Sequence, residues 1–147
     1  MAPLFALLTG FVVARLGGVL GIDALDNNRS ALRVGLALMF LLTGAAHFGP
    51  GRRAHLIAMV PPGLPRPDLL VTVTGVLELL GAAGLLLPAT ARAAAAGLAL
   101  LMLAMFPANV FAARHGVPLG GRPPMPLVPR TVLQVIFVGA AAAVAFG

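Results

Sequence analysis

Long apolar stretches with few charged side chains dominate this chain. Residues 34–51, 93–113 and 131–147 contain no Asp, Glu, Lys or Arg, and residues 69–91 contain one charged residue, Glu78. A helix needs about 20 mostly apolar residues to cross a bilayer. The pattern therefore predicts four membrane-spanning helices, at about 33–48, 69–87, 92–113 and 130–146.

A fifth apolar stretch lies at about 3–22, and Arg15 is the one charge that interrupts it. A secretory signal peptide begins with a basic segment and ends at a cleavage site of small residues. Because neither feature is evident here, we expect this stretch to be a retained fifth span.

Prolines separate the predicted helices. Ten of the thirteen prolines lie in segments 49–68 and 114–130, and proline ends a helix because it lacks a backbone N–H and clashes with the preceding turn. Two long proline-rich loops, 49–68 and 114–129, are therefore expected to connect the spans in pairs. The predicted fold is an all-α integral membrane protein with a single membrane domain, residues 1–147. It is an antiparallel four-helix transmembrane bundle plus an additional N-terminal transmembrane helix.

Composition supports a bilayer protein and excludes several chemistries. Hydrophobic residues make up 60% of the chain and charged residues 10%, whereas a soluble domain is about a quarter charged. The absence of cysteine excludes disulfides, cysteine metal sites and thiol catalysis. The net charge of +6 results from ten arginines, with no lysine, and four acidic residues. Arginines beside apolar spans indicate membrane orientation and not a nucleic-acid partner, and their distribution favours the long-loop side as cytoplasmic.

Glu78 is the most unusual residue of the apolar spans. It lies near the middle of its predicted span, where a carboxylate costs about 2.5–3.5 kcal/mol on insertion scales. It must therefore be paired, hydrogen-bonded or protonated. Thr74 lies one turn earlier on the same helix face. Two pairings are open, an ion pair with Arg15 at similar depth and a couple with His47.

Further polar residues flank the two proline-rich loops, which the predicted topology places on one side of the membrane. These residues are His47, Asn109, Arg130 and Gln134. Pro107 frees a backbone carbonyl one turn before it, next to Asn109. The topology therefore predicts one polar pocket between the helices, open toward the two loops.

Two interpretations of this pocket are open. In the functional one, Glu78 and His47 are the candidate catalytic residues and handle protons. The ligand-binding residues are then Asn109, Gln134, Arg130 and Thr74. In the structural one, Glu78 forms a buried pair, the amides make interhelical hydrogen bonds, and the arginines anchor to lipid headgroups. No metal site is predicted, because His47 is the only histidine within a span.

Two shorter segments predict local structure, one in the first proline-rich loop and one in the N-terminal span. Residues 52–60 are predicted to form a short interfacial helix with Leu56, Ile57 and Val60 facing lipid. Gly17 and Gly21 have the GxxxG spacing that lets transmembrane helices approach closely.

Five motifs lie in order along residues 33–146 of the chain. They are LTGAAHFGP (42–50), MVPPGLPRP (59–67), GVLELLGAAGLLLP (75–88), FPANVFA (106–112) and RTVLQ (130–134). In this order they resemble the DoxX-like family of small bacterial integral membrane proteins. The residues that match the family pattern are His47, Pro50, Glu78, Arg92, Pro107, Asn109, Arg130 and Gln134. The N-terminal span lies outside the resemblance.

The resemblance implies a multi-pass protein of the bacterial cytoplasmic (inner) membrane. The DoxX name is associated with a membrane subunit of a thiosulfate:quinone oxidoreductase, and relatives with oxidative-stress complexes. The leading hypothesis is an accessory subunit of a quinone-linked redox system, with a quinone as the candidate cofactor and a membrane redox protein or other protein as partner. The alternatives are a non-enzymatic membrane helper that stabilises or sorts a partner protein, and a small lipid-modifying enzyme. The sequence leaves open whether the chain is an enzyme.

Overall fold

The structure, a computed structural model, describes residues 1–118 and 123–147. The described residues form helices and no β-strand. In chain order the elements are α1 (Ala2–Val19), the short 3₁₀ helix η1 (Asp23–Leu25), α2 (Asn28–Ala46), α3 (Pro50–Met59), α4 (Pro67–Leu86), α5 (Ala91–His115) and α6 (Leu127–Phe146). Part of the predicted loop 114–129, residues 119–122 with Arg122, lies outside the described residues.

Within the described residues, five helices are long and apolar enough to cross a membrane: α1, α2, α4, α5 and α6. This confirms the all-α, multi-span architecture. α2 begins at Asn28, earlier than predicted, because the Asn27 side chain accepts a hydrogen bond from the backbone N–H of Ser30 at 2.8 Å and caps the helix. α6 begins at Leu127, because Pro129 lies in the first turn, where its missing N–H costs no helical hydrogen bond.

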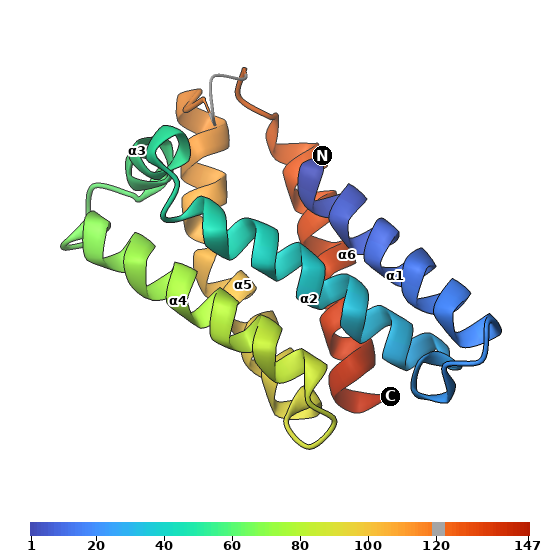
Figure 1. Cartoon of the computed structure of the whole chain (residues 1–147). Helices are drawn as coiled ribbons and strands as arrows, with labels where there is room; N and C mark the ends of the chain where they lie inside the picture. The colour runs from blue at the N-terminus through green and yellow to red at the C-terminus, as the bar shows by residue number, and fades with distance from the viewer. Residues whose placement is uncertain (119–122) are drawn as a thin grey trace.

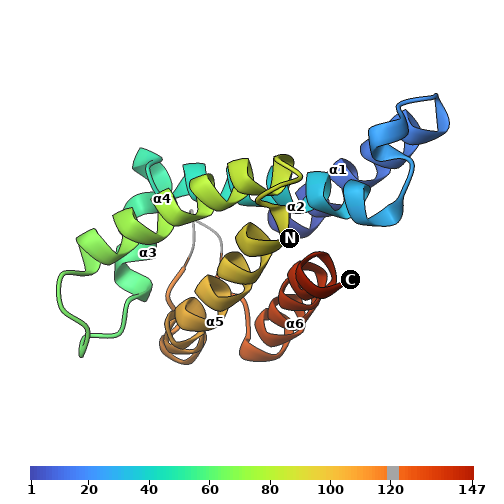
Figure 2. The ribbon, with the colours of Figure 1, turned by 90° about the horizontal axis from the view of Figure 1, so that it is seen from below.

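Four helices form a closed bundle, and α1 lies outside it. α2 packs against α4 and α6, α4 packs against α5, and α5 packs against α6, while α1 packs along α2 (Figure 1). Figure 2 shows α1, α2 and α4 in one layer and α5 and α6 in a second. The predicted antiparallel four-helix bundle with an additional N-terminal helix is therefore confirmed.

Glycines allow α1 to approach α2 closely, but they are not the two glycines that the sequence analysis predicted. A Cβ atom at Gly10 would lie 2.8 Å from the Cα atom of Gly35 in α2, so the two backbones touch. The GxxxG prediction for Gly17 and Gly21 was wrong, because α1 ends at Val19. Gly21 instead turns the chain with φ = +100°, a conformation that glycine adopts without steric cost.

Two arginines of α2 hold together the end of the bundle that lies away from the long loops. Arg29 donates to the backbone carbonyl of Val144 in α6, with its Nη2 atom at 2.6 Å. Arg33 donates to the carbonyls of Leu85 and Leu86 in α4, at 2.9 and 3.2 Å. The last carbonyls of a helix lack intrahelical donors. Each arginine therefore satisfies the C-terminus of a neighbouring helix.

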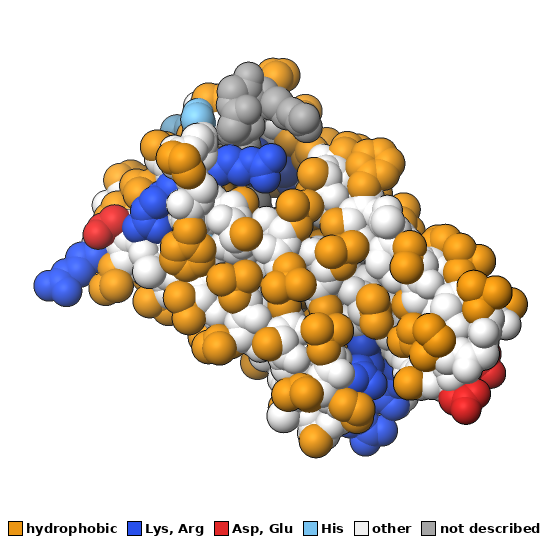
Figure 3. All heavy atoms as spheres, in the orientation of Figure 1, with side chains coloured by type: hydrophobic (Ala, Val, Ile, Leu, Met, Phe, Trp, Pro, Cys, Tyr) orange, Lys and Arg blue, Asp and Glu red, His pale blue; other side chains and the backbone are white. Residues whose placement is uncertain are grey.

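The outer surface of the bundle is largely apolar. Leu80, Leu100 and Val135, each within a spanning helix, are all more than 60% exposed. Figure 3 shows apolar side chains along the helix flanks, with charged side chains gathered toward the helix ends. This distribution fits a chain surrounded by lipid. The protein is therefore a multi-pass membrane protein, and the spans imply a bilayer around it.

Candidate functional site

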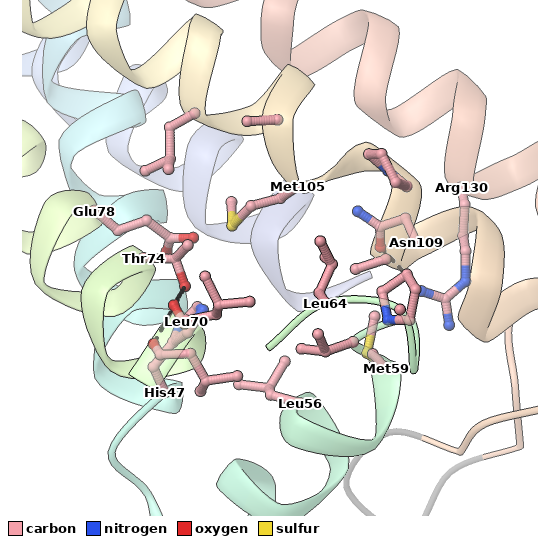
Figure 4. A pocket seen from close by; sticks show the side chains of 18 residues that line it. His47, Leu56, Met59, Leu64, Leu70, Thr74, Glu78, Met105, Asn109 and Arg130 are labelled. Carbon is pink, nitrogen blue, oxygen red and sulfur yellow. Dashed lines mark hydrogen bonds between the residues drawn. The ribbon is translucent and has the colours of Figure 1, made fainter. Parts of the chain in front are cut away.

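A cavity of about 810 Å³ lies between the loop-side halves of the helices. α4 and α5 form its walls, and α3 with the following proline-rich loop covers it (Figure 4). Its apolar lining includes Leu56, Met59, Val60, Leu64, Leu70, Leu101 and Met105, and its polar lining residues are His47, Thr74, Glu78, Asn109 and Arg130. The site is thus an apolar chamber with a few polar groups, less polar than the sequence predicts.

The polar groups lie on two opposite sides of the chamber. In Figure 4, Glu78, Thr74 and His47 lie on one side, and Asn109 and Arg130 lie on the other. Apolar side chains such as Leu64 and Met105 lie between the two groups. We call Glu78, Thr74 and His47 the acceptor side, and Asn109 and Arg130 the donor side, after the hydrogen-bonding groups that each side offers to a ligand.

Thr43 of α2 connects the two buried residues of the acceptor side. Its hydroxyl donates to Glu78 Oε2 at 2.5 Å, and its backbone carbonyl accepts from His47 Nδ1 at 2.9 Å. A carbonyl only accepts, so Nδ1 carries a hydrogen and a neutral His47 presents Nε2 as an acceptor. Glu78 is 3% exposed and His47 is 7% exposed. Glu78 and His47 therefore belong to one network, with Thr43 between them.

Arg15 does not pair with Glu78, so that alternative was wrong. The Arg15 guanidinium donates to the backbone carbonyl of Leu25 at 3.4 Å and lies 3.8 Å from the carboxylate of Asp26. Arg15 is one turn from the end of α1, where the chain turns into η1. Because α1 packs along α2 and η1, Arg15 finds its partners in that turn.

Thr74 is the third residue of the acceptor side, and the neighbouring Gly75 determines how close His47 lies to α4. The Thr74 hydroxyl donates to the backbone carbonyl of Leu70 at 2.9 Å, so only its oxygen lone pairs are available to a ligand. At Gly75, a Cβ atom would lie 2.5 Å from the Cβ atom of His47. The absence of a side chain at Gly75 therefore lets His47 lie against α4.

On the donor side, the guanidinium of Arg130 is hydrogen-bonded to the side-chain amide of Asn109. Arg130 Nη1 donates to Asn109 Oδ1 at 3.1 Å, and Arg130 Nε donates to the backbone carbonyl of Met125 at 2.9 Å. The NH₂ group of Asn109 and Nη2 of Arg130 make no hydrogen bond within the described residues, so both are donors that a ligand can use.

Gln134 is placed differently from the other predicted ligand residues. Its amide donates to the backbone carbonyl of Met102 at 2.7 Å and joins α6 to α5. It is not among the residues that line the chamber. Met102 lies next to Leu103, the residue whose carbonyl loses its usual N–H donor to Pro107. Gln134 therefore bonds the segment of α5 that proline weakens.

Two residues that shape the site, Thr43 and Arg53, were not predicted from the sequence. Thr43 shares a helix face with His47, but nothing in the sequence pairs it with Glu78 across 35 positions. Arg53 of α3 donates to the His47 carbonyl at 3.1 Å, the Asp68 carbonyl at 3.1 Å and the Thr72 hydroxyl at 2.9 Å. Arg53 thus joins α3 to the end of α2 and the start of α4, above the chamber.

The short helix α3 was predicted, but its orientation was not. Leu56 and Val60 line the chamber, so the prediction that they face lipid was wrong. The cause is the bonding of Arg53, which holds α3 across the end of the bundle. Among residues 1–118 and 123–147, no group of three His, Cys, Asp or Glu side chains could hold a metal ion.

A family model described as a domain of unknown function (DUF8561) matches residues 36–145. The chain belongs to this family. The match contains all the residues that line the chamber and leaves α1 outside. No curated protein and no solved structure matches the chain.

Proposed function

We propose that this protein binds a lipophilic molecule whose headgroup carries polar groups on two opposite sides. The single observation that carries the proposal is the 810 Å³ chamber with apolar walls and polar side chains on two opposite sides. Small-molecule sites are typically cavities of about 300–1,000 Å³ lined mostly by apolar groups with a few placed polar ones. The chamber has both the size and the composition of such a site.

The hydrogen-bond donors and acceptors that line the chamber restrict the chemical class of the ligand. The donor side, Asn109 and Arg130, suits a carbonyl oxygen. The acceptor side suits a hydroxyl, because Thr74 and a neutral His47 present lone pairs there. A quinone and its quinol carry oxygens on opposite sides of an apolar ring, as carbonyls or hydroxyls. A quinone-type lipid therefore fits the chamber best.

In this proposal Glu78 and His47 exchange protons with the ligand hydroxyl. Glu78 is the one acidic side chain among the described residues that line the chamber, and intramembrane carboxyls commonly serve in proton transfer. Quinone reduction also takes up two electrons, which a partner protein must supply. The five DoxX-like motifs agree with such a place beside a membrane redox enzyme in a bacterial inner membrane.

One observation favours a second candidate, the non-enzymatic helper. Every buried side-chain nitrogen and oxygen in the described residues has a hydrogen-bond partner within the protein. The polar network can thus hold the bundle together without a ligand. In that case the chamber is a structural void, and a ligand-binding assay decides between the two.

The test is native mass spectrometry of the full chain, released from mild detergent and supplied with decylubiquinone. Met105→Trp fills the chamber, whereas Leu103→Trp places the same ring on a residue of α5 that is 53% exposed. We expect one quinone bound to the wild-type chain and to Leu103→Trp, and loss of that complex in Met105→Trp. Equal quinone binding by both tryptophan variants would refute the proposal.

A further inference from the structure

A second cavity, of about 270 Å³, lies beside the chamber on the loop side of the bundle. It is lined by the first residues of α1, the last turn of α2, two residues of α3, and residues of the segment before α6 together with Arg130. His47, Leu56 and Arg130 line both cavities and so form the wall between them. Figure 3 shows basic side chains beside a hollow near the N-terminus of α1.

The lining of this cavity combines basic and apolar side chains. Arg52, Arg130 and His47 are its titratable side chains, and no Asp or Glu is among its described lining residues. Leu42, Ala46, Leu56 and Met125 supply apolar surface, as does Pro3. A site of this composition suits an amphiphile with an anionic head.

The arginines here differ from those at the other end of the bundle. There, Arg29 and Arg33 donate to the terminal carbonyls of neighbouring helices. Arg52 is exposed, and its guanidinium makes no hydrogen bond to any residue of 1–118 or 123–147, whereas its backbone N–H donates to the Gly49 carbonyl. Arg130 donates from Nε to Met125 and from Nη1 to Asn109. Its Nη2 carries two N–H groups, and Arg130 lines both cavities, so one donor remains for each cavity. Guanidinium donors are therefore available to an anion in this cavity.

We propose that the second cavity binds the phosphate headgroup of an anionic phospholipid, with Arg52 and Arg130 as the phosphate ligands. The cavity lies at the helix ends, at the depth of lipid headgroups in a bilayer. Leu42 and Ala46 of α2 then contact the start of an acyl chain. Arginine matches phosphate geometry with paired N–H donors, and each basic residue near an anionic surface contributes about a fivefold gain in affinity.

The test is a lipid titration of the full chain by native mass spectrometry, comparing phosphatidylglycerol with phosphatidylcholine. Arg52→Gln removes one phosphate ligand. Arg66→Gln removes an equal charge on the same side of the bundle from a residue that lines neither cavity. We expect a preference for phosphatidylglycerol that falls at least about fivefold in Arg52→Gln and is retained in Arg66→Gln. An equal fall in both variants, or no preference in the wild-type chain, would overturn the proposal.

A soluble phosphate compound could bind the same arginines as a lipid phosphate. Glycerol 3-phosphate presents the headgroup without acyl chains, and we expect it not to displace the bound lipid at equal concentration. Displacement by it would show an anion site and overturn the lipid assignment. This site is separable from the quinone site: Glu78→Gln should leave the phosphatidylglycerol preference intact, and Arg52→Gln should leave decylubiquinone binding intact.

Discussion

Replacing Thr43 with valine tests whether the acceptor side is one connected network. The substitution keeps the shape of the side chain and removes the hydroxyl that donates to Glu78, which is 3% exposed. A buried polar group that loses its partner costs about 1–3 kcal/mol. Interhelical hydrogen bonds measured in membranes average about 0.6 kcal/mol and reach about 1.7. We therefore expect Thr43→Val to lower the free energy of unfolding by about 1–2 kcal/mol.

The reason for this loss predicts how it can be reversed. Glu78→Leu removes the carboxyl that needs the donor, and replacing both members of a buried polar pair by apolar groups is often neutral or stabilising. The double variant should therefore be more stable than the sum of the two single changes predicts. Thr43→Ser, which keeps the hydroxyl, should recover most of the stability of the wild-type chain.

The assay is equilibrium unfolding in mixed micelles, followed by circular dichroism, for the wild-type chain and these four variants. Independent sites add within about 0.3–0.5 kcal/mol. Additivity of Thr43→Val and Glu78→Leu within that margin would show that the two side chains do not interact and would refute the network.

Three further predictions use the same unfolding assay. Gly75→Ala should destabilise the protein by about 1–3 kcal/mol, because the new Cβ atom would lie 2.5 Å from the Cβ atom of His47. Gly97→Ala should stabilise the protein by about 0.5–1 kcal/mol, because a Cβ atom there meets open space. Destabilisation by both substitutions would contradict this reasoning. Arg53→Met should leave stability within about 1 kcal/mol but raise the rate of limited proteolysis in residues 60–66, and unchanged cleavage would show that Arg53 does not hold α3 in place. Arg33→Met should cost about 1–3 kcal/mol because two carbonyls of α4 lose their donor, and a loss below about 0.3 kcal/mol would contradict that role.

The sequence predicted the helices and the side of the bundle on which the polar residues meet. Length, hydropathy and proline positions are local properties, so they located all five spans without knowledge of contacts. Alternation of antiparallel helices then placed His47, Asn109 and Arg130 at the same end. The structure has these residues around one chamber together with Glu78.

What the sequence could not predict was the partner of each polar group. Arg15 and Glu78 have similar depths along their helices, but depth does not say which helices are neighbours, and α1 packs along α2. Thr43 is an ordinary residue in a helix until α4 places Glu78 beside it. The orientation of α3 likewise depends on Arg53 and its three acceptors, which are distant in sequence or belong to the backbone.

Under the proposed function, the chamber receives a lipophilic ligand from the membrane. Photolabelling with an azidoquinone in proteoliposomes, followed by mapping of the modified peptides, tests it most directly. We expect the label to concentrate on chamber residues such as Leu64 and Met105, and we expect unlabelled decylubiquinone to compete for these positions. Labelling spread over lipid-facing residues such as Leu100 and Leu103, without competition, would contradict it.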